Sequence, residues 1–171
     1  MLQMRRLPMM LATCLFALSM ASWAQDNQVL KAAAGYTPVL KYDPTRDASK
    51  DISEANAEAK RTGKRVLIQV GGDWASWCHT LDTFFETHTD LRELRDANYV
   101  TVDVNFSREN QNKKVLARYG QIIEYPHLFV TDADGKVLVS QWTSPFEKGE
   151  TYDPEKFRAF LVEWSPPRPR K

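Results

Sequence analysis

The chain has 171 residues, of which 43% are hydrophobic and 26% are charged, a globular composition that excludes a disordered or fibrous chain. The formal net charge is +1, so no excess of basic residues points to nucleic acid as a partner. Two cysteines, Cys14 and Cys78, are too few for the disulfide framework of a small secreted domain.

The first 24 residues have the pattern of a cleaved secretory signal peptide. Arg5 and Arg6 form a positively charged start, residues 11–21 form a short apolar core, and small residues precede a cut after Ala24. No apolar run is long enough to cross a membrane, so we expect no stable membrane span. The pattern predicts a periplasmic or secreted protein.

An alternative start is lipidation at Cys14, because residues 11–14 loosely resemble a bacterial lipobox. Thr13 is a poor residue at that position, and the apolar core continues past it, so we favour cleavage. Cleavage leaves Cys78 as the single cysteine of the exported chain. An isolated thiol in an oxidising compartment is unusual unless it is buried.

The next segment, 25–47, is polar and interrupted by glycine and proline, which predicts an extended lead-in. Residues 48–62 have helical spacing of apolar positions and end before Gly63, a residue typical of a helix C-cap. Residues 65–70 form a short β-branched run that predicts a buried strand. Asp73 then stands where it can cap a helix with one apolar stripe.

Further along, residues 99–106 alternate valine with polar residues, which indicates a strand. Asp132–Gly135 carries turn residues between two apolar runs and predicts an antiparallel hairpin. Asp153 and Pro154 predict the start of a last helix. The remaining expected elements are helices over 90–96 and 109–119, hairpin strands over 127–131 and 137–141, and a disordered tail over 165–171.

The domain over 48–164 is therefore predicted to be α/β, with a central mixed sheet covered by helices on both faces. Within it, the strand 66–70 leads into Gly-Gly-Asp-Trp-Ala-Ser-Trp-Cys-His, and Tyr125-Pro126 precedes the hairpin. These pieces resemble exported thioredoxin-like thiol–disulfide oxidoreductases, whose motif reads G-x-D-W-C-x-W-C. The resemblance covers residues 52–164 and implies a thioredoxin fold with an N-terminal helical extension.

Two registers of this motif are possible. Matching only the Trp77-Cys78 dipeptide makes Cys78 the first, attacking cysteine of the family's C-x-x-C pair. Matching from the strand without a gap puts Ala75 at the attacking position and Cys78 at the second, and it also accounts for Leu81 and Asp82. We prefer the ungapped register, in which the motif is a degenerate A-x-x-C.

The loss at Ala75 matters because the first cysteine of such a pair attacks the substrate disulfide and the second resolves the mixed disulfide. Alanine has no sulfur, so the two-electron dithiol cycle is excluded for the cleaved chain. Cys78 then remains as the one candidate catalytic residue. Its position in the apolar stripe predicts burial, which disfavours the thiolate, and the alternative is that Cys78 is only a small buried core residue.

The resemblance also implies a substrate groove. Pro126 matches the family's cis-proline, although a trans proline opening a strand is the alternative. Tyr125 and His127 flank it and are expected to line the groove together with Trp74, Ala75 and Trp77; packing is the competing role for Trp77. Gln69 stands where thioredoxins often keep a buried acid.

No metal site or cofactor is predicted, since Cys78 and His79 are adjacent on a helix and point about 100° apart. The expected partners are protein thiols or disulfides, including a redox partner protein. Two functions remain open. In the first, Cys78 acts as a single thiol in disulfide exchange; in the second, a redox-inactive groove near Pro126 binds an extended peptide.

Overall fold

The computed structural model describes residues 36–167. The signal segment, Cys14, the first part of the lead-in and most of the tail lie outside the described residues. The elements in chain order are α2 (Ala48–Thr62), β1 (Arg65–Gly71), α3 (Ser76–Thr87), α4 (Thr89–Asn98), β2 (Tyr99–Asn105), α5 (Lys113–Leu116), β3 (His127–Thr131), β4 (Val137–Trp142), the 3₁₀ turn η1 (Ser144–Phe146), β5 (Glu147–Lys148), β6 (Thr151–Tyr152) and α6 (Pro154–Glu163).

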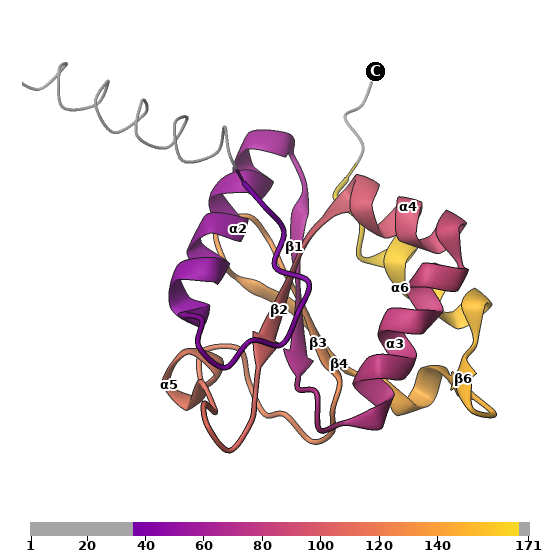
Figure 1. Ribbon diagram of the computed structural model, residues 1–171. Helices are drawn as coiled ribbons and strands as arrows, with labels where there is room; N and C mark the ends of the chain where they lie inside the picture. Colours follow the sequence, from indigo (N-terminus) through magenta and orange to yellow (C-terminus); the bar gives the residue numbers. More distant parts are fainter. Residues whose placement is uncertain (1–35, 168–171) are drawn as a thin grey trace, which may run out of the picture.

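A four-stranded mixed sheet in the order β2-β1-β3-β4 forms the centre of the domain. β1 pairs parallel with β2 and antiparallel with β3, and β3 pairs antiparallel with β4. Helix α2 covers one face, while α3, α4 and α6 cover the other (Figure 1). This arrangement confirms the predicted α/β class and the thioredoxin fold.

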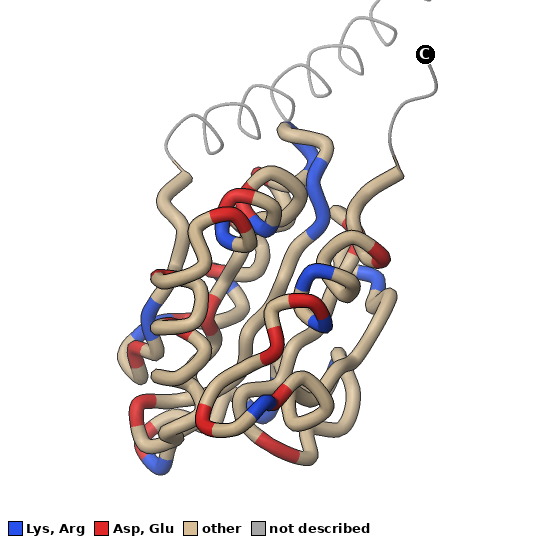
Figure 2. Tube along the Cα trace, turned by 90° about the vertical axis from the view of Figure 1, so that its right-hand side faces the viewer, with Lys and Arg blue, Asp and Glu red and all other residues tan. Residues whose placement is uncertain are grey.

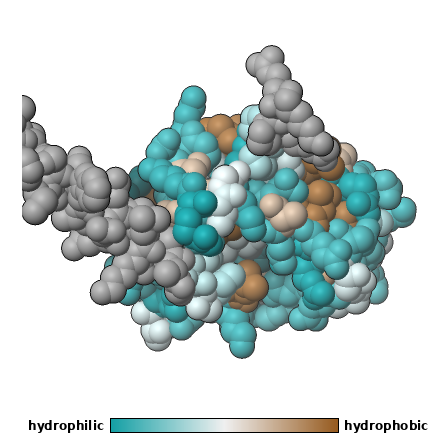
Figure 3. Space-filling view, turned by 90° about the horizontal axis from the view of Figure 1, so that it is seen from above, coloured by the Kyte–Doolittle hydropathy of each residue, from teal (hydrophilic) through white to brown (hydrophobic). Residues whose placement is uncertain are grey.

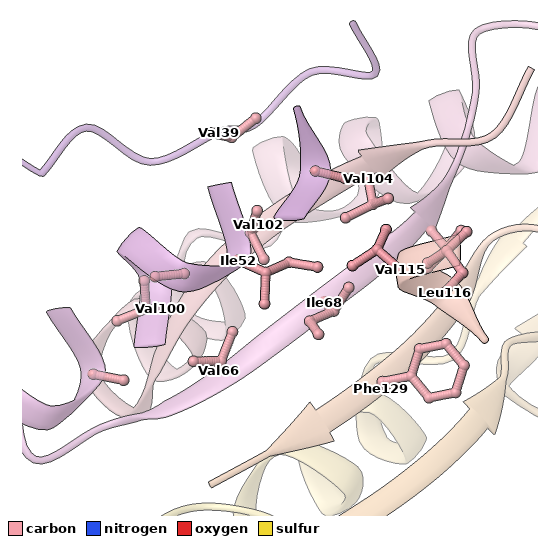
Figure 4. Close-up of a cluster of buried hydrophobic side chains, with 14 residues drawn as sticks. Val39, Ile52, Val66, Ile68, Val100, Val102, Val104, Val115, Leu116 and Phe129 are labelled. Atoms are coloured by element: carbon pink, nitrogen blue, oxygen red, sulfur yellow. The ribbon is translucent and has the colours of Figure 1, made fainter. Parts of the chain in front are cut away.

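The core under α2 is built mainly from aliphatic side chains of the helix, β1 and β2, and it is completed by Val115 and Leu116 of α5 and Phe129 of β3 (Figure 4). Val39 of the lead-in joins this core, where it forms a parallel bridge with Val102 and its carbonyl accepts a 2.8 Å hydrogen bond from the Asp103 amide. The described end of the lead-in therefore lies beside β2, at the edge of the sheet. The polar composition of the lead-in did not predict this pairing.

The core on the other face is aromatic. Phe84 of α3 contacts Phe157 of α6 at a centroid distance of 5.0 Å and Tyr152 of β6 at 5.8 Å. Tyr152 is 1% exposed and Phe157 is fully buried. The short β5–β6 hairpin and α6 are thus fixed against α3, the helix that carries Cys78.

Several predicted boundaries are confirmed by the local geometry. Gly63 ends α2 with φ of 68°, and the Asp153 carboxylate accepts from the Glu155 amide at the start of α6. The predicted hairpin over 127–141 is present as β3 and β4. α4 (Thr89–Asn98) extends the predicted helix by a residue or two at each end.

Two predictions are wrong. The helix expected over 109–119 is reduced to α5, because Asn112 has a left-handed φ of 49° and its side-chain amide donates to the Asn105 carbonyl at 2.8 Å. Such local side-chain bonds compete with helix formation. Asp73 does not cap α3; the N-cap is Ala75, with no side-chain hydrogen bond.

The surface carries acidic and basic residues side by side. Figure 2 shows both signs interspersed over the face formed by α3, α4 and α6. Figure 3 views the end of the domain opposite the start of α3, where the visible surface is mostly hydrophilic with small separate apolar areas. Among the helices of residues 36–167, none is long and apolar enough to cross a membrane.

Candidate functional site

The candidate site lies where β1 ends and α3 begins, at the lower end of the sheet in Figure 1. The chain turns at Gly72, whose carbonyl accepts from the Ala75 amide at 3.0 Å, and the Ala75 carbonyl accepts from the Cys78 amide at 3.0 Å. Ala75 is therefore the N-cap residue of α3, and Cys78 lies in the first helical turn. Unpaired amides and the helix dipole at such a terminus favour negative charge.

Cys78 is a free, fully buried thiol. It packs in a small cluster with Tyr42 and Ala75, against which Tyr125 also lies. Its sulfur rests directly on the backbone of Gly71, because a Cβ built on this glycine would be 2.4 Å from Sγ. The end of β1 thus needs glycine for steric reasons, and the predicted burial of Cys78 is found.

Burial is the main influence on the Cys78 thiol and raises its pKa above the ordinary value. The Gly72 backbone and the Tyr42 hydroxyl act in the opposite direction, while Asp82 and Asp103 add to the increase in pKa. The thiol is consequently protonated at neutral pH.

The loop before β3 forms the second wall of the site. The Tyr125–Pro126 peptide bond is cis, as the resemblance implied. Tyr125 stacks on Phe106 at 4.9 Å and meets the edge of Trp74 at 5.2 Å. The Trp74 indole in turn donates a 2.6 Å hydrogen bond to the Phe106 carbonyl. Three segments distant in sequence therefore form one aromatic rim, which consists of Trp74, Phe106 and Tyr125.

A surface hollow of about 400 Å³ adjoins this rim, lined by Trp74, Phe106, Ser107, Arg108, Glu109 and Gln111. Trp74 remains 59% exposed, which is high for an indole. Trp77, in contrast, is half-buried and packs on Tyr152 at 5.2 Å, so it belongs to the aromatic core rather than to the rim. Of the predicted groove residues, the structure thus brings together Trp74, Ala75 and Tyr125.

His127 does not line the groove, contrary to the prediction. It is 1% exposed, its Nε2 atom lies 2.8 Å from the Ser140 hydroxyl, and burial lowers its pKa. Pro126 precedes it, and the Pro126 carbonyl accepts from the Thr143 hydroxyl at 3.2 Å. Within the described residues no group of three or more His, Cys, Asp or Glu side chains is arranged to hold a metal ion.

Sequence reasoning missed two side chains of the site interior, Tyr42 and Asp103. Gln69 of β1 is the Cα partner of Asp103 on β2, and its Nε2 donates to the Tyr42 hydroxyl at 2.7 Å. The same amide lies 3.5 Å from a carboxylate oxygen of Asp82. The alternation of residues 99–106 indicated that Asp103 and the valines point to opposite faces of the sheet. It did not show that the face of Asp103 is also covered, and this cover is what buries the carboxyl group.

The buried carboxyl group of Asp103 predicts how the stability of the protein depends on pH. Asp103 is 5% exposed, and its Oδ1 atom has no hydrogen-bond partner among the described residues. Burial, and secondarily the neighbouring Asp82, raise its pKa well above the ordinary value of 3.8. Above that ordinary value the unfolded state releases this proton before the folded state does, so stability falls with rising pH.

We therefore expect Asp103→Asn to stabilise the protein by about 2 kcal/mol near pH 8 and to have little effect near pH 4. Denaturant unfolding of both proteins at the two pH values measures this difference. A loss of stability of equal size at both pH values would refute it, because the carboxyl would then be needed as a structural group.

Comparison with known proteins agrees with this architecture. A family-wide sequence profile described as thioredoxin-like matches residues 47–133, about half of the chain. The disulfide bond reductase DsbH of Chlamydia pneumoniae is 24% identical over 102 residues, which are 54% of this chain and 61% of that protein. The chain thus matches only about three fifths of the length of this curated relative.

Two solved structures share the fold. A disulphide isomerase from Xylella fastidiosa Temecula1 superimposes with a TM-score of 0.62 at 23% identity, covering 71% of this chain and 94% of that one. The oxidised C-terminal domain of Neisseria meningitidis DsbD gives a TM-score of 0.54 at 15% identity, covering 69% of this chain and 96% of that one. The fold, the site at the start of α3 and the profile define the class: the chain belongs to the thioredoxin-like family.

Proposed function

We propose that this chain is an exported thioredoxin-like protein that takes part in thiol–disulfide exchange through the single thiol of Cys78. The observation that carries the proposal is the position of a free cysteine three residues after the N-cap Ala75, beneath the cis-proline loop. The names of the relatives, a disulfide bond reductase and a disulphide isomerase, support the same chemistry.

The register with Ala75 at the attacking position is part of the proposal. It is supported by the helix boundary, since the first residue of a C-x-x-C pair lies at a helix N-terminus, where the thiolate is favoured. Ala75 is 8% exposed and packs with Cys78. A partner sulfur that takes the place of the missing side chain at Ala75 would therefore meet the Cys78 thiol once the side chains that cover it move aside.

The proposed reaction balances without a cofactor. Cys78 loses its proton to solvent, and the thiolate attacks one sulfur of a partner disulfide. A mixed disulfide forms between Cys78 and that sulfur, and the second partner sulfur leaves as a thiolate that is protonated by solvent. Trp74 and the Tyr125 ring would contact the partner segment, and the backbone of Tyr125, just before the cis-proline, would pair with it as an extended strand.

Export is proposed from the signal pattern alone, with residues 1–24 removed, a lead-in over 25–47, the domain over 48–164 and a disordered tail over 165–171. Periplasmic or extracellular conditions are oxidising, so protein disulfides are available there as partners. N-terminal sequencing of the exported protein is expected to begin at Gln25.

The test is the formation of a mixed disulfide between the folded protein and a peptide disulfide, with Cys78→Ser as the control. We expect an adduct on the wild-type chain that forms faster as the pH rises, because the raised pKa of Cys78 limits the thiolate fraction. The control should give no adduct.

A second candidate function is a redox-inactive module that binds an extended peptide. The full burial of Cys78 and the exposed Trp74 beside a 400 Å³ hollow favour it. If the folded protein forms no adduct, yet binds a reduced peptide with an affinity that Trp74→Ala lowers at least tenfold, the binding module is the function and the single-thiol proposal is wrong.

A further inference from the structure

One side chain of the lead-in reaches the interior of the candidate site. The Val39 bridge to Val102 fixes the segment against β2, and Tyr42 follows three residues later. Tyr42 is 5% exposed and shares a cluster with Ala75 and Cys78. The lead-in thereby contributes to the surroundings of the thiol, although it precedes the first helix of the domain.

The Tyr42 hydroxyl and the Cys78 sulfur occupy the same small space above the end of β1. A Cβ built on Gly71 would be 3.0 Å from both Cζ and the hydroxyl oxygen of Tyr42, and 2.4 Å from Sγ of Cys78. Only a glycine at this point leaves room for the two polar groups together.

Gln69 determines where the hydroxyl hydrogen of Tyr42 points. The Gln69 amide donates to the Tyr42 oxygen at 2.7 Å, and its placement near the Asp82 carboxylate at 3.5 Å agrees with this amide orientation. A neutral phenol has one hydrogen to donate. Because Gln69 is a donor to Tyr42, that hydrogen is directed elsewhere, and the Cys78 sulfur belongs to the same small cluster, close to the same point of the Gly71 backbone.

From this geometry we infer that Tyr42 is a positioning residue of the site, whose hydroxyl donates a hydrogen bond to the Cys78 thiolate formed during disulfide exchange. The inference rests on the proposed function. Tyr42 keeps its own proton throughout, since the proton of Cys78 passes to solvent and the leaving thiolate is protonated by solvent. The lead-in is then a functional part of the site and not only a connection.

The other titratable groups facing Cys78 do not replace this donor. Asp82 of α3 and Asp103 of β2 are carboxyl groups whose negative charge opposes the thiolate. Tyr152 of β6 directs its hydroxyl to the Trp77 carbonyl and the Thr143 hydroxyl, each at 3.3 Å. Tyr125 also packs against this cluster, but of these hydroxyl groups it is that of Tyr42 which acts on the Cys78 thiol.

The test is Tyr42→Phe, which removes one oxygen and keeps the ring. The ultraviolet absorbance of the thiolate is followed against pH in the full chain, and the curve of the matching Cys78→Ser protein is subtracted in each background. We expect the titration to move to higher pH and the thiolate fraction near pH 8 to fall about tenfold, the effect of one hydrogen bond to a charged group.

Tyr36→Phe is the matched control, since its hydroxyl lies in the same segment but donates to the Thr101 carbonyl. Its titration curve should match the wild type. A Tyr42→Phe curve that also matches the wild type would overturn the inference. The absorbance needs no partner, so this outcome is independent of whether disulfide exchange itself is observed.

A second variant, Gln69→Glu, keeps Tyr42 intact and replaces the amide donor with a carboxylate that accepts the hydroxyl hydrogen. We expect the thiol titration to move to higher pH, and to move less when the same change is made in the Tyr42→Phe background. A shift of the thiol titration that is equal in both backgrounds would refute the role of Tyr42. If Tyr42→Phe fails to fold, the Gln69→Glu variant alone is the test, and an unchanged thiol titration in it would refute the role.

Discussion

Replacing Ala75 with cysteine should create a dithiol pair with Cys78 and convert the chain into a reductase with a two-electron cycle. Ala75 is the N-cap of α3, where a thiol is exposed to the unpaired helix amides, and Cys78 follows at the spacing of a C-x-x-C pair. We expect a rate of disulfide reduction at least 100-fold above that of the wild-type chain, because the new cysteine supplies the missing attacking sulfur.

The structural readout of this variant is the internal disulfide. Mild oxidation of Ala75→Cys should reduce the intact mass by two hydrogens and protect both thiols from alkylation. Ser76→Cys is the matched control, since it lies one residue further along the same helix turn and has the wrong spacing for a pair. If Ala75→Cys forms no internal disulfide, the register that places Ala75 at the attacking position is wrong.

The second large effect is expected from Gly71→Ala at the end of β1. The added methyl group would lie 2.4 Å from the Cys78 sulfur, closer than side-chain atoms tolerate, and in tight contact at 3.0 Å with the Tyr42 ring. Overpacking of this kind in a buried site costs about 2–3 kcal/mol. Denaturant unfolding should therefore show Gly71→Ala to be destabilised by this amount.

The same methyl group should lower the free energy of unfolding by less when the sulfur of Cys78 is absent. In a Cys78→Ala background we expect the penalty of Gly71→Ala to fall by about half, because the contact with Tyr42 remains. Gly63→Ala is the matched control: its φ of 68° penalises alanine, but nothing lies within 4 Å of the new methyl. Its penalty should be the same in both backgrounds. Equal penalties for Gly71→Ala would contradict the contact between Gly71 and Cys78.

Much of the fold could be predicted because its signals are local. Gly63 marks the end of α2, Asp153 begins α6, and the turn at 132–135 joins β3 to β4, each through the backbone conformation or the capping bond that its residues favour. The helix expected over 109–119 failed for a local reason as well, since the asparagines there bind the backbone and interrupt it.

Only those residues of the candidate site that lie together in one segment of the sequence, or that the family resemblance supplied, could be predicted. The motif from Gly71 to His79 contains Trp74, Ala75 and Cys78, and the resemblance added the cis-proline at Pro126. Tyr42 reaches the thiol from 36 positions earlier, and Asp103 becomes an interior group only through its pairing with Gln69 across the sheet. Spacing along the sequence carries no signal for such contacts, because they depend on how β1, β2 and the lead-in are placed side by side.

The burial of Cys78 leaves the central claim open to one direct measurement, the intact mass of the folded chain after incubation with a peptide disulfide. The single-thiol account predicts one peptide adduct on the native protein, located at Cys78, with a yield that rises with pH. An adduct that forms only after the protein has been unfolded would contradict the account, because Cys78 would then be a core residue that no partner reaches.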